Sequence, residues 1–226
     1  MIRLCLTVEG QTEEGFVRDI LLPHLLQFDV LTVTRLVEFS RSKGRINRGG
    51  VRKYVNIKHD ILSWAKECSG NDVRFSSMLD LYALPSDWPG FADAREIKDP
   101  YTRVRTLETA MGDDLGDWRF TPHIQLHEFE ALLFADASKF AVFYVDSRRA
   151  LSELSTIANS VTSPELIDDG PTTAPSKQII ARLPQYEREK PLAGPQIAAE
   201  IGLATMREKC PHFDQWIRQL EQLGKR

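Results

Sequence analysis

Near the N-terminus the chain reads Val8-Glu9-Gly10-Gln11-Thr12-Glu13-Glu14-Gly15-Phe16. Before this stretch, every second residue from Ile2 to Val8 is a branched apolar residue, a period of two that is typical of a β-strand. After it, the apolar residues between positions 16 and 21 follow helical spacing. The stretch therefore predicts a strand that ends at Glu9, followed at once by a helix with Glu13 in its first turn.

Two carboxylates are placed by this junction at the carboxyl edge of a sheet, where open α/β folds bind ligands. Gly10 is expected at the turn, because a residue without Cβ leaves the backbone room, and Thr12 is a plausible N-cap. Carboxylates at a strand end and in a first helical turn suit magnesium, which takes oxygen ligands in near-octahedral geometry. Glu13 also has a simpler explanation, since an acid in a first turn complements the helix dipole. Glu9 is harder to explain in that way, because a carboxylate that closes a buried strand needs a partner.

Two later junctions repeat this arrangement. Asp80 ends an apolar run that predicts a strand. If this strand is a neighbour of the first, Asp80 faces Glu9. The alternative is that Asp80 only caps the following loop. Glu128 and Glu130 lie in a third strand-to-helix junction, where they share a face if the backbone is extended and diverge if it is helical. His127 lies beside them without the i, i+4 histidine pair of zinc proteases, so zinc is not expected there.

Composition is ordinary for a soluble globular protein. The chain has 226 residues, 42% of them hydrophobic and 27% charged, with a formal net charge of −3. This balance gives no global attraction to nucleic acid, so such contact needs a local basic patch. No apolar run approaches the roughly 18 residues of a membrane-spanning helix, and no membrane partner is expected.

The cysteines and the remaining histidines carry no ligand pattern. The three cysteines are Cys5, Cys68 and Cys210, which lie far apart and outside any Cys-x-x-Cys pair. This favours a reducing compartment, no structural zinc and a cytoplasmic location. Four histidines lack ligand spacing and are expected to be surface or core residues: His24, His59, His123 and His212.

One segment concentrates basic side chains with glycines between them. Its cations, without an acid among them, are Arg41, Lys43, Arg45, Arg48, Arg52 and Lys53. Such a loop suits a phosphate backbone, although a solvated loop that happens to be basic is an equal alternative. Lys177 falls near the first turn of a helix predicted from Pro175 to Leu183. A lysine at the positive end of a helix is a candidate anion contact, with simple solvation as the alternative.

Strands that alternate with helices predict a mainly parallel sheet flanked by helices. From about residue 136 the pattern becomes helical, so we expect an α/β core over residues 1–135 and a helical extension over residues 136–226, packed on the core or continuous with it. No glycine-rich Walker loop is present in the sequence, which argues against nucleotide hydrolysis by that route.

Several local motifs together resemble known families. The Glu-Gly-x-Thr-Glu start and the strand that ends in Asp80 are similar to the TOPRIM domain of topoisomerases, primases and overcoming-lysogenization-defect nucleases. The combination more closely resembles a bacterial family of unknown function with a TOPRIM-like core, the domain of unknown function 4276. The further motifs that carry this resemblance are Leu79-Asp80-Leu81-Tyr82-x-Leu84-Pro85, His127-Glu128-Phe129-Glu130-Ala131-Leu132-Leu133, Pro175-Ser176-Lys177 and Cys210-Pro211-His212-Phe213.

The resemblance implies a TOPRIM-like fold, Mg²⁺ or Mn²⁺ held by the acids, and a role beside a nearby-encoded ABC-type ATPase in defence against phage. Glu9 matches the family's first acid, Glu13 the helix acid of the nuclease branch, and Asp80 the first residue of its Asp-x-Asp motif. The third position of that motif is Tyr82 here, so one ligand is missing from its usual place. Glu128 or Glu130 is the expected substitute, and cleavage with two metals, with one metal or no cleavage all stay open.

The first hypothesis is therefore a metal-dependent nuclease effector. Its metal ligands are expected among Glu9, Glu13, Asp80, Glu128 and Glu130. Glu13 could instead act as a general base, Lys177 would stabilise developing negative charge, and the basic segment would hold the nucleic-acid backbone. A non-catalytic module that binds an ATPase partner or nucleic acid is the main alternative, favoured by Tyr82. An enzyme that transfers a nucleotidyl or phosphoryl group to a small molecule is the third.

Overall fold

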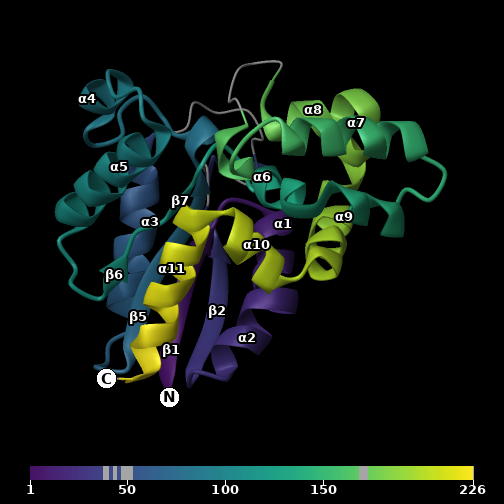
Figure 1. Ribbon diagram of the computed structural model, residues 1–226. Coiled ribbons are helices and arrows are strands. Elements are labelled where there is room, and N and C mark those ends of the chain that lie inside the picture. The colour runs from purple at the N-terminus through teal and green to yellow at the C-terminus, as the bar shows by residue number, and fades with distance from the viewer. Residues whose placement is uncertain (38–40, 43–44, 47–52, 168–172, 226) are drawn as a thin grey trace.

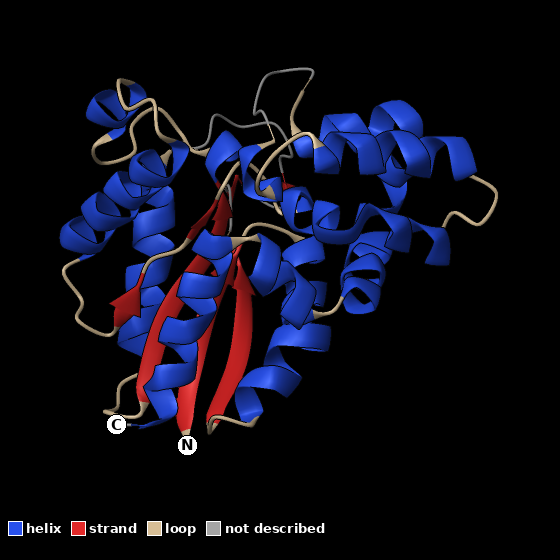
Figure 2. Cartoon of the chain, in the orientation of Figure 1, coloured by secondary structure: helices blue, strands red, loops and turns tan. Residues whose placement is uncertain are grey.

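The computed structural model describes residues 1–37, 41–42, 45–46, 53–167 and 173–225. At its centre lies a parallel sheet with the strand order β2-β1-β5, and two short strands, β6 and β7, both pair with the outer side of β5. Figure 2 shows these strands side by side with their arrowheads toward the same end. Their bounds are β1 Ile2–Val8, β2 Val30–Leu36, β5 Val73–Asp80, β6 Phe120–Thr121 and β7 Ile124–Gln125.

Helices cover both faces of the sheet, which confirms the predicted α/β class (Figure 1). One face packs against a set formed by α1 Gln11–Phe16, the π-helical turn η1 Val17–Leu21, α2 Leu22–Leu26, α9 Tyr186–Ile201 and α11 Pro211–Gln222. The other face packs against α3 Tyr54–Glu67, α4 Phe91–Arg95 and α5 Pro100–Leu115.

Strand β1 is buried on both faces. The alternating pattern of its sequence would suit a half-buried strand, yet every residue from Leu4 to Val8 is buried. Its position between β2 and β5 explains this, because Leu4 joins the core beneath α1 and α11 while Cys5 packs with Trp64 and Phe75 on the opposite face. The strand that leads to Glu9 is thus paired on both edges and covered on both faces.

The remaining helical segments mostly follow the last strand. They are η2 Leu81–Ala83, α6 Glu130–Leu133, η3 Phe134–Val142, α7 Arg148–Asn159, η4 Pro164–Leu166, α8 Pro175–Arg182, α10 Leu203–Lys209 and η5 Leu223–Lys225. Figure 1 shows α6, α7 and α8 beyond the carboxyl ends of the strands. A single hydrophobic cluster joins Leu4 and Phe16 to Phe140, Ile197 and Phe213. The helical part therefore packs on the sheet, and the division at residue 135 stays a prediction.

Helices α1 and α9 approach each other closely through glycines. A Cβ on Gly194 would lie 2.7 Å from Cγ2 of Thr12, and one on Gly15 would lie 2.7 Å from Cγ of Pro195. Thr12 is therefore buried within α1 beside α9, and the predicted N-cap is wrong: Gly10 holds that position with an extended backbone. This close contact sets the first turns of α9 above the carboxyl edge of the sheet.

Candidate functional site

The acids predicted from the strand ends come together at the carboxyl edge of the sheet. Glu9 directly follows β1, and its Oε2 accepts a hydrogen bond of 3.1 Å from the backbone N–H of Asp80, the last residue of β5. The carboxylate of Asp80 accepts one of 2.9 Å from the N–H of Phe129. That bond ties the segment with Glu128 and Glu130 to β5, so all three junctions share one edge.

Crowding and burial change the acidity of this group, which we call the carboxylate cluster: Glu9, Glu13, Asp80, Glu128 and Glu130. Burial, followed by repulsion from the other four, raises the pKa of Asp80 well above its usual range. Burial and then the nearby Glu130 and Glu9 raise the pKa of Glu13 to about 7. Burial and repulsion thus make it costly to ionise these acids together, and a bound cation would lower that cost.

Glycine at position 10 makes room for one of these carboxylates. Its backbone is extended, and a Cβ there would lie 3.1 Å from Oε2 of Glu13. The Glu13 side chain, only 7% exposed, folds back toward the strand end. The glycine predicted for a turn therefore has a steric role beside the carboxylate.

A lysine that the sequence did not single out lies against the carboxylate cluster. Nζ of Lys190, in α9, is 2.9 Å from Oε1 of Glu130, which also receives a bond of 3.4 Å from the hydroxyl of Tyr186. Burial alone would lower the pKa of Lys190, but the charges of Glu130, Glu128 and Asp80 outweigh it and raise this pKa. No local pattern marks Lys190, because its place depends on how α9 packs on α1.

Lys177, the lysine proposed from the sequence, is exposed in the first turn of α8. Its neighbour Ser176 makes the contact with the cluster instead. The N–H and hydroxyl of Ser176 donate bonds of 2.8 and 3.1 Å to the two oxygens of Glu128. The Pro-Ser-Lys motif therefore fixes a carboxylate through its serine, and the predicted role of Lys177 stays a prediction.

A strained turn delivers Glu128 to the cluster. His127 has φ 63°, the left-handed region that non-glycine residues rarely adopt, and the N–H of Glu128 bonds to the carbonyl of Leu126 at 3.0 Å. The carbonyl of His127 accepts a bond of 3.0 Å from the N–H of Tyr82. Tyr82, the residue at the third motif position, is 47% exposed and lies at the surface. Strain of about 1–3 kcal/mol is typical of turns whose geometry serves a site.

The basic segment begins at the same edge of the sheet. The N–H of Val37, just after β2, bonds to the carbonyl of Val8 at 3.0 Å, and Lys53 is exposed at the start of α3. Arg41 and Arg45 belong to a two-strand antiparallel pair, β3 Arg41–Ser42 and β4 Arg45–Ile46. The other predicted contacts lie outside the described residues: Lys43, Arg48 and Arg52.

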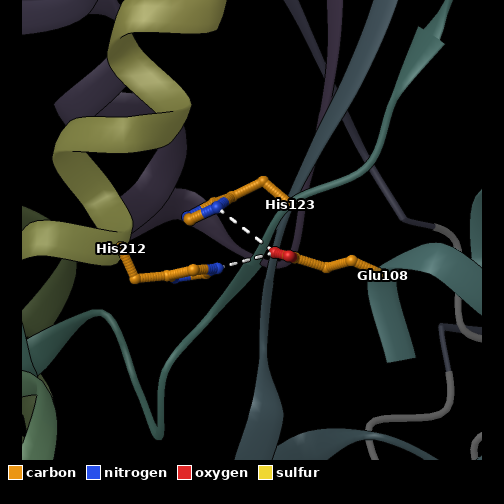
Figure 3. A group of neighbouring side chains, drawn as sticks. All are labelled: Glu108, His123 and His212. Atoms are coloured by element: carbon orange, nitrogen blue, oxygen red, sulfur yellow. Dashed lines mark hydrogen bonds and ion pairs between the residues drawn. The ribbon is translucent and has the colours of Figure 1, made fainter. Parts of the chain in front are cut away.

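A second group joins Glu108 to two histidines that were expected only to be surface or core residues. Oε1 of Glu108 lies 3.0 Å from Nε2 of His212 and 3.6 Å from Nδ1 of His123 (Figure 3). Within the described ranges, these three form the one set of His, Cys, Asp and Glu side chains whose ligand atoms all lie within 4.8 Å of one another, close enough to hold a metal ion. The expectation for His123 and His212 is therefore incomplete, since the fold joins positions that are far apart in sequence.

In the parts of the chain that the structure describes, no helix is both long enough and apolar enough to cross a lipid bilayer.

Comparison with known proteins gives one match. No curated protein and no solved structure matches the chain. A family model described as a domain of unknown function, DUF4276, matches residues 8–221, which include the carboxylate cluster and the second group. The chain therefore belongs to the DUF4276 family.

Proposed function

We propose that this chain is a metal-dependent phosphodiester-cleaving effector with a TOPRIM-like core, acting with an ABC-type ATPase in bacterial defence against phage. The observation that carries the proposal is the carboxylate cluster at the carboxyl edge of a parallel sheet, with Glu9 and Asp80 in direct contact. Acids delivered from the ends of neighbouring strands are the usual support for a metal ion in phosphoryl chemistry.

The donor set fits Mg²⁺ or Mn²⁺. All its members are carboxylates, the hard oxygen ligands that these ions prefer, and burial and mutual repulsion raise the pKa values of Glu13, Asp80 and Glu128. A divalent ion there would relieve this repulsion and supply charge stabilisation to a phosphate group. Glu9 and Asp80 are the first candidates to hold it, with Glu128 or Glu130 in the place that Tyr82 leaves without an acid.

The protein groups around the cluster suggest distinct roles. Glu13, with a pKa of about 7, is able to exchange a proton at neutral pH and is our candidate general base. Lys190, ion-paired with Glu130, is better placed than Lys177 to neutralise negative charge on a phosphate. The segment between Val37 and Lys53 starts at the same edge and supplies cations for a nucleic-acid backbone.

Two observations favour the alternative, a non-catalytic module that binds an ATPase partner or nucleic acid. The acids already accept protein hydrogen bonds: Glu9 from Asp80, Asp80 from Phe129 and Glu128 from Ser176. Among the described residues, they also do not form a set of three within 4.8 Å. In that case the cluster would be an internal hydrogen-bonded hub that holds the sheet edge together.

A cleavage assay separates the two functions. Purified wild type, with and without an ABC-type ATPase as the proposed partner, is incubated with single- and double-stranded DNA and RNA in Mn²⁺, Mg²⁺ or EDTA. We expect cleavage only with a divalent ion, and a loss of at least a hundredfold in Asp80→Asn, which keeps the shape of the side chain but removes its charge. Asp93→Asn, at an exposed position in α4, is the matched control and should cleave like wild type.

Binding data complete the test. Calorimetry with Mn²⁺ should show affinity at least tenfold weaker in Glu9→Gln and Asp80→Asn than in wild type. Wild type that binds Mn²⁺ yet cleaves nothing with its partner present would support the non-catalytic module. If neither substitution weakened Mn²⁺ binding, the carboxylate cluster would not be a metal site.

A further inference from the structure

Away from the carboxylate cluster, a half-buried carboxylate faces two buried imidazoles. Glu108 lies in α5, His212 in the first turn of α11, and His123 between β6 and β7 (Figure 3). Three separate elements thus direct one oxygen and two nitrogens at a common point. The relative exposure is 1% for His123 and 6% for His212, so solvent does not explain their orientation.

Local structure fixes the position of His123. Pro122 has no N–H for the ladder, and β6 ends at Thr121 before β7 begins at Ile124. In the gap, the hydroxyl of Ser77 donates to the carbonyl of His123 and accepts from its N–H, both at 3.0 Å. The imidazole then stacks on the indole of Trp216, with ring centroids 4.2 Å apart and planes at 6°.

His212 is held just as firmly. Glu165, which is fully buried, accepts hydrogen bonds from the N–H groups of His212 and Phe213 at 3.1 and 2.9 Å, and so closes the start of α11. The Cys-Pro-His-Phe motif thereby places a histidine at a fixed helix start, with Pro211 at the first helical position. Ligands held by rigid elements lose little freedom when they bind an ion.

The distances are close to those of a metal site. In a tetrahedral zinc site with bonds of about 2.1 Å, ligand atoms lie about 3.4 Å apart. Oε1 of Glu108 is 3.0 Å from His212 Nε2 and 3.6 Å from His123 Nδ1, and all three atoms lie within 4.8 Å. The two imidazoles stack with centroids 4.9 Å apart and planes at 22°, so both rings must rotate on their fixed backbones for their nitrogens to point at one ion.

Chemistry and surroundings point to the same class of ion. Two imidazoles and one carboxylate suit zinc and similar transition metals, whereas Mg²⁺ prefers oxygen alone. A cavity of about 610 Å³ is lined by all three residues, which leaves room for a further ligand. Open positions of this kind distinguish reactive zinc sites from closed structural ones.

We propose that Glu108, His123 and His212 bind one transition-metal ion of the zinc class, with its open position toward the cavity. This site is separate from the carboxylate cluster and does not depend on the proposed cleavage activity. It lies beside Ser77, three residues before Asp80 on β5, which corresponds to about 10 Å along the strand.

Titration of the metal-free protein with Zn²⁺ and Co²⁺ tests this site. An excess of Mg²⁺ is present to occupy the carboxylate cluster, calorimetry gives the affinity, and visible absorption of Co²⁺ reports nitrogen ligation. We expect one equivalent of Co²⁺ to bind wild type with a tetrahedral spectrum. Zn²⁺ affinity should fall at least tenfold in Glu108→Gln and His212→Gln, while Asp80→Asn should keep it.

The matched control is His59→Gln, at an exposed histidine of α3, which should bind Zn²⁺ like wild type. Glu108→Gln keeps one side-chain oxygen to accept from the N–H of Ile124 and to contact the ring of His212, so this variant tests the site even if His212→Gln does not fold. The proposal is overturned if wild type binds no Zn²⁺. It is equally overturned if Glu108→Gln binds as wild type does, or if His59→Gln weakens binding as much as Glu108→Gln.

Discussion

Glu13→Gln should make the metal-free protein more stable at neutral and alkaline pH. Glu13 is 7% exposed, and burial together with the charges of Glu130 and Glu9 raises its pKa from the ordinary 4.5 to about 7. Between these two values the folded protein keeps a proton that the unfolded chain releases. The free energy of unfolding therefore falls as pH rises through this window, and the loss is complete above about pH 7.

The size of this effect follows from the same pKa. Each pKa unit corresponds to about 1.4 kcal/mol, so the rise from 4.5 to about 7 costs wild type about 3 kcal/mol at pH 8. For a chain of 226 residues this is a change in Tm of about 6–12 °C. A glutamine has no such charge to bury, and its side-chain oxygen still accepts a hydrogen bond.

Urea unfolding at pH 5 and pH 8, in EDTA, measures the difference. Because pH 5 already lies above the unfolded-state pKa, wild type should lose about 2.5 kcal/mol more between the two pH values than Glu13→Gln. The control is Glu14→Gln, one residue further along α1 and partly exposed, which should follow wild type. Equal losses in wild type and Glu13→Gln would show that this carboxylate is not crowded, and the cation site inferred from the crowding would lose its main support.

Three further outcomes are expected. At pH 8, Mn²⁺ at about 100 times its Kd should stabilise wild type by about 2.7 kcal/mol in urea unfolding, and no stabilisation would argue against a metal site. Lys190→Met should destabilise the metal-free protein by about 1–3 kcal/mol, because Glu130 loses its ammonium partner. It should also tighten Mn²⁺ binding about tenfold in calorimetry, because the positive charge of Lys190 no longer repels the ion. Unchanged Mn²⁺ binding would show that Lys190 does not interact with the ion. Gly194→Ala should cost about 1–3 kcal/mol in urea unfolding, since its Cβ would lie 2.7 Å from Cγ2 of Thr12, and adding Thr12→Ser should recover most of it; no recovery would refute the steric explanation.

The sequence alone identified the parallel sheet and the acids at its edge. Apolar strands that end in Glu9 and Asp80 carry this information locally, because the carboxyl ends of parallel strands share one edge and side chains there face the same space. The same logic located Glu128 and Glu130 at the third junction. The periodicity of apolar residues and the direction of the strands were sufficient to predict that these acids lie at one edge of the sheet.

Only the tertiary structure placed Lys190 against Glu130 and joined His123 and His212 to Glu108. Lys190 reaches the cluster because glycines let α1 and α9 approach closely, and His212 reaches His123 because α11 returns across the sheet from the end of the chain. These contacts depend on how helices pack, which is set by side chains distant in sequence. Residue spacing within one strand or helix therefore could not predict these contacts.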